Sequence, residues 1–186
     1  MSDKVSSHLS KNRIKTYVLI SLFTAIIAVC SFITVPAVVP FTLQTLGIFT
    51  ALSVLGGKRG TVCTVLYILL GILGIPVFSG FSAGLGHLLG ATGGYIIGFI
   101  FLSLTYLIIT AVFGNKFTVK AVGLVSGLLV CYLFGTLWYM LVYLKTLTTD
   151  AFISTLSVCV LPFIIPDLIK IALALFIDRK IPNTVR

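Results

Sequence analysis

Apolar residues occur in long stretches along this chain, and short segments rich in polar residues, glycine or proline separate them. A helix needs about 20 apolar residues to cross a hydrocarbon core about 30 Å thick, and it satisfies its own backbone hydrogen bonds. The pattern therefore predicts an all-α membrane protein with six transmembrane helices. The predicted spans lie at about residues 16–35, 41–55, 61–75, 90–113, 120–144 and 153–177.

The separating segments have recognisable turn chemistry. Pro36 and Pro40 divide the first two spans, and Gly56-Gly-Lys-Arg-Gly60 predicts a tight basic turn. A loop rich in Gly, Ser and Phe is expected at residues 76–89. The first apolar stretch ends in no small-residue cleavage site, so we interpret it as a retained span. The predicted organisation is an N-terminal segment (1–15), a single six-helix domain (16–180) and a C-terminal tail (181–186).

Composition and charge add an orientation. The residues are 59% hydrophobic and 9% charged, whereas soluble domains are about 25% charged. Cytoplasmic loops collect Lys and Arg, and with the N-terminus inside only Lys145 falls on the outer side. The inner cations are Lys4, Lys11, Arg13, Lys15, Lys58, Arg59, Lys116, Lys120, Arg179, Lys180 and Arg186. We expect both termini in the cytoplasm of a multi-pass cell-membrane protein, and no nucleic-acid surface, because the cations are spread over separate segments.

Two ionisable residues, Asp167 and Lys170, fall inside the last predicted span. Their i, i+3 spacing puts them on one helical face. Such residues cost at least a few kcal/mol in a bilayer and usually mark a pathway or a ligand site. A structural ion pair facing the bundle interior is the simpler interpretation. Pro162 and Pro166 can break or kink the helix just before the pair and open backbone carbonyls to a ligand.

Other polar candidates lie on the predicted outer side, where irregular backbone can line a cavity. Gln44 needs a partner, in the protein or on a ligand, because an unpaired buried amide is costly. Tyr95 lies beside the glycine ladder Gly90, Gly94 and Gly98, which most simply indicates close helix packing. His87 falls at a membrane boundary, and we interpret it as interfacial.

Aromatic and small residues complete the set of candidates. Phe41 and Trp138 lie at outer span ends, where they either line a pocket or belong to an aromatic belt. The four cysteines are widely spaced in apolar runs and predict packing rather than metal or redox chemistry. Ser21, Ala25 and Ala28 give the first span a smooth face, suited to packing inside the protein or against another membrane subunit.

Three segments together resemble the BioY family, the biotin-binding S components of energy-coupling factor (ECF) transporters. They are Val39-Pro-Phe-Thr-Leu-Gln-Thr45, the glycine-rich run containing Ala91-Thr-Gly-Gly-Tyr-Ile-Ile-Gly98, and Pro166-Asp-Leu-Ile-Lys170. Chain length and predicted topology agree with this resemblance over nearly the whole chain. It implies high-affinity biotin binding near the outer face. Asp167 and Lys170 would take the ureido ring, and Gln44, Tyr95, Phe41 and Trp138 would line the site.

The resemblance also implies partners. S components work with a transmembrane coupling subunit and two ATP-binding cassette ATPases, and the coupling subunit docks on the small-residue face of helix one. In this chain that face contains Ala25 and Ala28, with Ser21 beside them. The strict Ala-x-x-x-Ala spacing known from S components is absent. The family mechanism further implies that the subunit tips over in the bilayer to release its ligand.

Two other classes of function remain to be weighed. A stand-alone secondary transporter of biotin or another small vitamin normally has ion-coupling residues and often an inverted repeat, and this sequence shows neither. An intramembrane enzyme needs a nucleophile with a base or two carboxylates, and His87 and Asp167 form no obvious pair. The sequence also has no G-x-x-x-x-G-K-[ST] loop. We therefore expect no catalytic activity, no cofactor and no metal.

Overall fold

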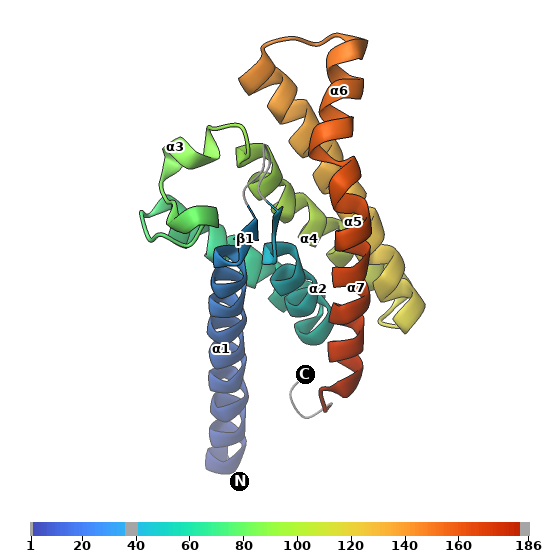
Figure 1. The fold of residues 1–186 in the computed structure, drawn as a ribbon. Helices are drawn as coiled ribbons and strands as arrows, with labels where there is room; N and C mark the ends of the chain where they lie inside the picture. The colour runs from blue at the N-terminus through green and yellow to red at the C-terminus, as the bar shows by residue number, and fades with distance from the viewer. Residues whose placement is uncertain (1, 36–40, 183–186) are drawn as a thin grey trace.

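The computed structural model describes residues 2–35 and 41–182, with side chains from Arg13 onward, and these residues are helical almost throughout (Figure 1). Pro36 and Pro40 lie outside the described residues. The elements are α1 (Ser2–Phe32), β1 (Thr34–Val35), β2 (Phe41–Thr42), α2 (Gln44–Ile72), the 3-10 turn η1 (Ser79–Phe81), α3 (Leu85–Leu88), α4 (Gly93–Phe113), α5 (Phe117–Trp138), the π-helix η2 (Tyr139–Leu144), α6 (Thr149–Cys159) and α7 (Leu161–Lys180).

Helix α1 is long and stands at one side of the molecule, where it packs on α2 (Figure 1). It begins at Ser2, so the polar N-terminal segment continues directly into the first apolar stretch without a break. Strands β1 and β2 then form a short antiparallel hairpin, in which Thr34 pairs with Thr42. This hairpin delivers the chain to the start of α2, one of the segments with candidate site residues.

Helix α2 is divided into two arms at Gly56, whose φ of 81° and ψ of 166° are not helical. Only glycine adopts this φ readily. The arms run side by side in opposite directions, since Gln44 Nε2 donates to Tyr67 Oη over 2.8 Å. At Gly60 an added Cβ would lie 2.7 Å from the Cα of Leu52, so the close approach of the arms requires glycine there too. The predicted turn at this basic cluster is confirmed.

Helices α4 and α5 also pack closely, and glycines make this possible. A Cβ added to Gly94 would lie 2.2 Å from the Cβ of Trp138, and one added to Gly98 would lie 2.9 Å from Cys131 Sγ. Lipid tails are as apolar as the helix side chains, so the hydrophobic effect does not drive helices together in a bilayer. Close van der Waals packing of this kind supplies much of the free energy of helix association instead. The interpretation of the glycine ladder as a packing surface is confirmed for Gly94 and Gly98, whereas Gly90 lies before α4 and does not pack on another helix there.

The last predicted span is bent. Helices α6 and α7 meet at 45° across Val160, whose φ and ψ leave the helical region. Pro162 follows in the first turn of α7, where its missing N–H costs nothing. Pro166 lies inside α7 and does not end it. A break is therefore present at Val160, just before Pro162, but the expected break or kink at Pro166 is not, because α7 continues through Pro166 and Asp167.

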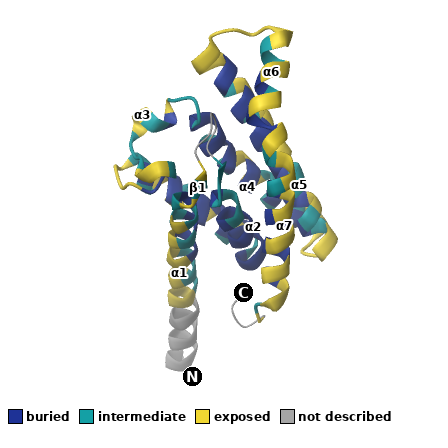
Figure 2. Ribbon diagram, viewed as in Figure 1, coloured by how far each residue is buried: buried dark blue, intermediate teal, exposed yellow. Residues whose placement is uncertain are grey.

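Four of the described helices are long and apolar enough to cross a membrane, and the bent α6–α7 pair gives a fifth if it is one span. The prediction of a helical membrane protein is therefore confirmed, with four or five candidate spans among the described helices where six were predicted. Large apolar side chains are exposed on the outward faces of the helices, among them Leu133, Ile165 and Phe176. Buried residues concentrate in α2 and α4 (Figure 2). An outward apolar surface of this kind suits a bilayer.

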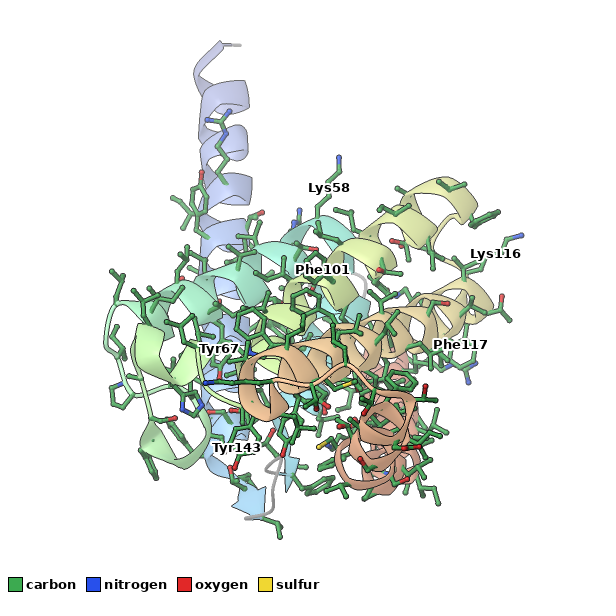
Figure 3. All side chains as sticks on the ribbon, turned by 90° about the horizontal axis from the view of Figure 1, so that it is seen from above. Lys58, Tyr67, Phe101, Lys116, Phe117 and Tyr143 are labelled. Carbon is green, nitrogen blue, oxygen red and sulfur yellow. The ribbon has the colours of Figure 1, made fainter. Side chains whose placement is uncertain are left out.

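The cations at the helix ends are not alike. Lys58 and Lys116 point away from the protein, as loop charges should (Figure 3). The prediction that Lys120 belongs with them is wrong. Helix α5 already begins at Phe117, so Lys120 lies in its first turns, where it is 5% exposed. A counter-ion on α7 makes this burial possible, because Lys120 Nζ donates to Asp178 Oδ2 over 2.8 Å.

This second buried pair generates a test of stability. Lys120 Nζ also donates to Ser53 O over 2.8 Å, so the pair joins α2, α5 and α7. Removing one partner leaves a buried charge, which costs ~3 kcal/mol. We expect Lys120→Met to lower the free energy of unfolding by that amount in detergent. The Lys120→Met, Asp178→Leu double variant should recover most of the loss. Equal stability of Lys120→Met and wild type would contradict this account.

Candidate ligand-binding site

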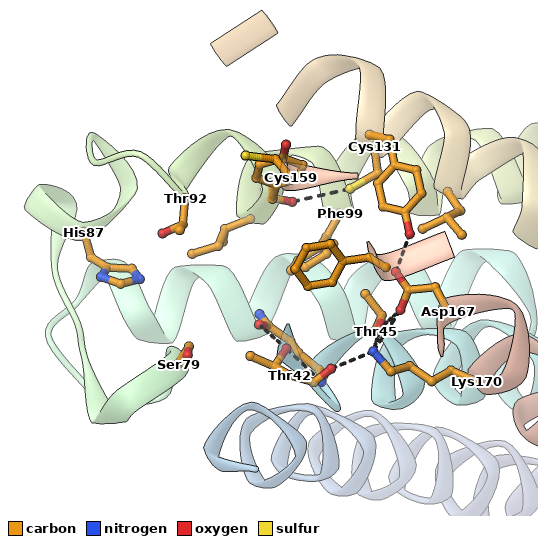
Figure 4. A pocket seen from close by; sticks show the side chains of 16 residues that line it. Thr42, Thr45, Ser79, His87, Thr92, Phe99, Cys131, Cys159, Asp167 and Lys170 are labelled. Carbon is orange, nitrogen blue, oxygen red and sulfur yellow. Dashed lines mark hydrogen bonds and ion pairs between the residues drawn. The ribbon is translucent and has the colours of Figure 1, made fainter. Parts of the chain in front are cut away.

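A cavity of about 80 Å³ lies between α2, α4, α5 and α7, and the loop before α4 and the end of α6 complete its wall. Most of the lining surface is apolar. Asp167 and Lys170 lie at one end and His87 at the other, with Thr42 between them (Figure 4). The lining residues are Thr42, Gln44, Thr45, Ser79, His87, Thr92, Tyr95, Ile96, Phe99, Leu128, Cys131, Tyr132, Cys159, Phe163, Asp167 and Lys170. The chain thus brings together residues more than a hundred positions apart in its sequence.

Asp167 is the centre of a hydrogen-bond network at one end of this cavity. Its Oδ1 accepts from Lys170 Nζ over 2.8 Å and from Thr45 Oγ1 over 2.9 Å. Its Oδ2 accepts from Tyr132 Oη over 2.6 Å. An ionised carboxylate has about four acceptor sites, and three are used here. Asp167, 3% exposed, can therefore take one more donor without losing a protein partner.

Lys170 is more fully engaged than Asp167. Besides Asp167, its Nζ donates to Thr42 O over 2.7 Å and to Thr45 Oγ1 over 3.0 Å, which uses all three N–H groups of an ammonium. The same nitrogen lies 4.1 Å from the ring centroid of Phe41, a distance suited to a cation–π contact. A ligand carbonyl can reach Lys170 only by replacing or sharing one of these acceptors.

The other predicted site residues differ in how closely they approach the cavity. Gln44 and Tyr95 line it, and the amide of Gln44 has the partner that its burial requires in Tyr67. Phe41 is not among the lining residues, but it packs on two of them. Its ring centroid lies 4.1 Å from Lys170 Nζ and 6.1 Å from the ring centroid of Phe163. The structure thus brings Asp167, Lys170 and these three residues around one cavity, and their roles there stay predictions.

Trp138 is not brought to this cavity. It packs on Gly94, and its Nε1 donates to Gly90 O over 3.1 Å. Its role as a wall of the site stays a prediction. On α1, Ser21 and Ala25 are exposed and Ala28 is half-buried. This face is therefore largely free in the described part of the chain, and its predicted contact with another subunit also stays a prediction.

Sequence reasoning missed Thr45 and Tyr132, the two hydroxyls that hold Asp167. Thr45 could have been predicted from the sequence, because it follows Gln44 in a segment already identified as polar. Tyr132 lies in the middle of an apolar helix, where a tyrosine gives no signal of its own. Its placement depends on how α5 packs against α7, which no local pattern reveals.

The opposite end of the cavity contains His87, which was expected at the membrane interface. Its ring lies 5.5 Å from the ring of buried Phe78, and its Nε2 is 3.3 Å from Ser82 Oγ. Partial burial lowers the pKa of His87 below its usual range, because desolvation penalises the imidazolium. The ring is therefore neutral near pH 7, so one of its nitrogens donates a hydrogen bond and the other accepts one.

The site has the chemistry of a binding pocket for a small, partly apolar molecule. The opposite charges of Asp167 and Lys170 neutralise one another, so the pocket does not demand a charged group at that end. A neutral group with an N–H beside a C=O matches the remaining acceptor of the carboxylate and the ammonium. Apolar side chains such as Ile96, Phe99 and Leu128 provide the surface for the rest of the molecule.

Comparisons with known proteins agree with this picture. The family model described as "BioY family" matches residues 1–186. A probable biotin transporter BioY from Pyrococcus horikoshii is 39% identical over 165 residues, 88% of this chain and 93% of that protein. The biotin transporter BioY from Thermotoga maritima is 36% identical over 161 residues, 86% of this chain and 91% of that protein.

A solved structure is similar as well. The crystal structure of the S-component for biotin from an ECF-type ABC transporter superposes with a TM-score of 0.78 at 26% sequence identity. The superposition covers 91% of this chain and 92% of the other. The similarity of fold therefore extends over nearly the whole chain.

The network around Asp167 predicts a measurable contribution from Thr45. Thr45→Val keeps the shape but removes one donor to Asp167 and one acceptor for Lys170, at about 1–3 kcal/mol. We expect a lower free energy of unfolding in detergent. Thr105→Val is the matched control, because Thr105 is only half-buried and its hydroxyl donates to Phe101 O of its own helix. Equal effects of the two substitutions would contradict the assigned network.

Proposed function

Because the chain belongs to the BioY family, we propose that it binds biotin and serves as the substrate-capture subunit of an ECF-type vitamin uptake transporter. The observation that carries the proposal is the buried Asp167–Lys170 pair, which lines a mainly apolar cavity and keeps one acceptor site unused. A cyclic urea offers an N–H donor for the unused acceptor site of Asp167 and a carbonyl acceptor for Lys170.

The ureido ring of biotin has two N–H donors beside one carbonyl acceptor. One N–H donates to Asp167, which is held in place by Tyr132 and Thr45. The carbonyl accepts from Lys170 in place of one of its protein acceptors, Thr45 Oγ1 or Thr42 O. Hydrogen bonds to charged groups are about twice as strong as neutral ones. The pair therefore contributes both affinity and orientation.

The sulfur-containing ring and the acid chain of biotin are mostly apolar, and the middle of the cavity suits them. Ile96, Phe99, Leu128 and Phe163 line this part. Burial of apolar ligand surface contributes roughly 25 cal/mol per Å². Gln44 and Tyr95 complete the proposed surroundings of the ligand, with Phe41 behind Lys170. Trp138 lies outside the cavity and packs on Gly94.

The proposal includes a topology and a set of partners. Counting the two arms of α2 and the bent α6–α7 pair gives six spans, with both termini in the cytoplasm and the biotin site near the outer face of the cell membrane. Six spans favour this orientation because the exposed loop cations then face the cytoplasm. Energy for uptake comes from two separate ABC ATPases through a transmembrane coupling subunit. Biotin accumulation by vesicles that contain only this chain would contradict that dependence.

Substitution of the charged pair tests the binding proposal. We expect Asp167→Asn and Lys170→Met each to weaken biotin binding at least about tenfold, because each removes a charged hydrogen bond and leaves its partner charge buried. Isothermal titration of purified protein in detergent measures the effect.

Matched controls exist at two exposed positions, Lys145 just after η2 and Asp150 in the first turn of α6. Asp150→Asn and Lys145→Met make the same chemical changes at exposed positions, and we expect wild-type affinity from both. Wild-type affinity in Asp167→Asn and Lys170→Met as well would refute the assigned site. Absence of biotin binding by the wild-type protein would refute the function.

The face of α1 gives a separate test of assembly. Ala25 is exposed, and a large side chain there prevents the close helix approach that small residues permit. We expect Ala25→Phe to retain biotin affinity but to lose co-purification with the coupling subunit. Ile169→Phe, on the exposed face of α7, is the control and should co-purify normally. Normal assembly of Ala25→Phe would place the docking surface elsewhere.

A further inference from the structure

Helix α5 begins beside the end of α7, and exposed cations gather where the two helix ends meet (Figure 1). Lys116 directly precedes α5, and Arg179 and Lys180 lie in the last turn of α7. All three side chains are exposed, and we call them the basic corner. The nearby carboxylate of Asp178 is buried and already paired with Lys120 over 2.8 Å. It is therefore not the counter-ion of the basic corner.

Aromatic rings lie against two of these cations. Cζ of Arg179 is 3.8 Å from the ring centroid of Phe117, and Nζ of Lys180 is 5.6 Å from that of Phe176. Both distances suit cation–π contacts. The two rings are themselves 43% and 56% exposed. In a helix that crosses a bilayer, this arrangement sets the cations at the level of the lipid headgroups and leaves apolar ring surface for the acyl chains.

Arg179 is well prepared to bind a phosphate. The ring of Phe117 covers the face of its guanidinium and leaves the N–H groups at the edge. Among the described residues, no hydrogen bond or ion pair engages those N–H groups. The edge of a guanidinium matches two oxygens of a phosphate with parallel hydrogen bonds. Because the stacked side chain is already ordered, it loses less rotamer freedom when a phosphate binds.

The cations beside the turn of α2 lack this arrangement. Lys58 is exposed and Arg59 is half-buried, close to the turn at Gly56. In the part of the chain that the structure describes, neither of them makes a cation–π contact. Positive charge near a helix end is therefore common to both places, whereas exposed rings under the cations distinguish the basic corner.

We propose that the basic corner binds an anionic phospholipid of the surrounding bilayer. Arg179 donates two parallel hydrogen bonds to the lipid phosphate, and Lys116 and Lys180 add attraction to its negative charge. The first carbons of the acyl chains lie against Phe117 and Phe176. This site is separate from the ligand cavity, and it does not rest on the recognition of biotin.

The chemistry of the corner selects among phosphate-containing molecules. A zwitterionic lipid brings a cation of its own toward the three cations of the protein, which weakens the attraction. A water-soluble phosphate has no acyl chain and covers no ring surface. An anionic phospholipid combines the two features that the corner offers, and we expect it to bind more tightly than either.

Native mass spectrometry of the full chain in detergent tests the site, with phosphatidylglycerol and phosphatidylcholine of identical acyl chains as competing probes. We expect the wild type to retain phosphatidylglycerol about tenfold better, since hydrogen bonds between charged groups are the stronger ones. The Lys116→Gln, Arg179→Gln double variant should reduce this preference at least about fivefold. Arg179→Lys keeps the charge but loses the paired donors, so its preference should lie between the two.

The Lys58→Gln, Arg59→Gln double variant is the matched control, because it removes the same amount of charge at a position without the rings. It should keep the wild-type preference. Equal retention of the two lipids by the wild type would overturn the proposal. An equal loss of preference in the two double variants would also overturn it, because the preference would then come from net charge alone.

Two further measurements identify the occupant. Glycerol 3-phosphate carries a phosphate without acyl chains, and we expect that it does not displace the lipid at equal concentration. Displacement would assign the corner to a soluble phosphate instead. If the Lys116→Gln, Arg179→Gln variant retained phosphatidylglycerol normally but lost co-purification with the coupling subunit, the corner would belong to a protein partner. Since none of these readouts uses biotin, the lipid site and the proposed function can fail independently.

Discussion

Burial of two opposite charges inside a chain that lipid surrounds is the constraint on which the site depends. Each ion loses several kcal/mol of hydration, and the attraction between the charges repays this loss only when further hydrogen bonds complete the geometry. Asp167 and Lys170 meet that condition through Thr42, Thr45 and Tyr132. These partners come from β2, α2 and α5. The pair therefore fixes where three segments must meet, and the cavity forms beside that meeting point.

The glycine contacts explain how the segments come so close. Gly56 reverses the chain, so that both arms of α2 face the core, and Gly94 and Gly98 draw α4 against α5. A second buried pair, Lys120 with Asp178, joins the same helices about 16 Å further along α7, eleven residues at about 1.5 Å each. The two pairs stabilise the α2–α5–α7 contact at both ends. Between Asp167 and His87 the cavity can remain mainly apolar.

Much of the fold follows from local pattern, because hydropathy and turn residues act over short distances. The apolar stretches, the turn at Gly56 and the break before Asp167 could all be predicted. The i, i+3 spacing of Asp167 and Lys170 likewise put a pair on one face. Long-range packing was not predictable in the same way. Tyr132 and the burial of Lys120 depend on which face of α5 meets α7, and His87 reaches the cavity only through the path of the loop before α4.

The central claim is that the buried pair recognises a cyclic urea. The most direct measurement is a calorimetric titration of the purified chain with biotin and with diaminobiotin, the analogue in which the ureido carbonyl is removed. The account predicts that the analogue binds at least about a hundredfold more weakly, because it cannot accept from Lys170 and brings a cation toward it. Affinities within about threefold of one another, a difference of less than 1 kcal/mol, would contradict the claim.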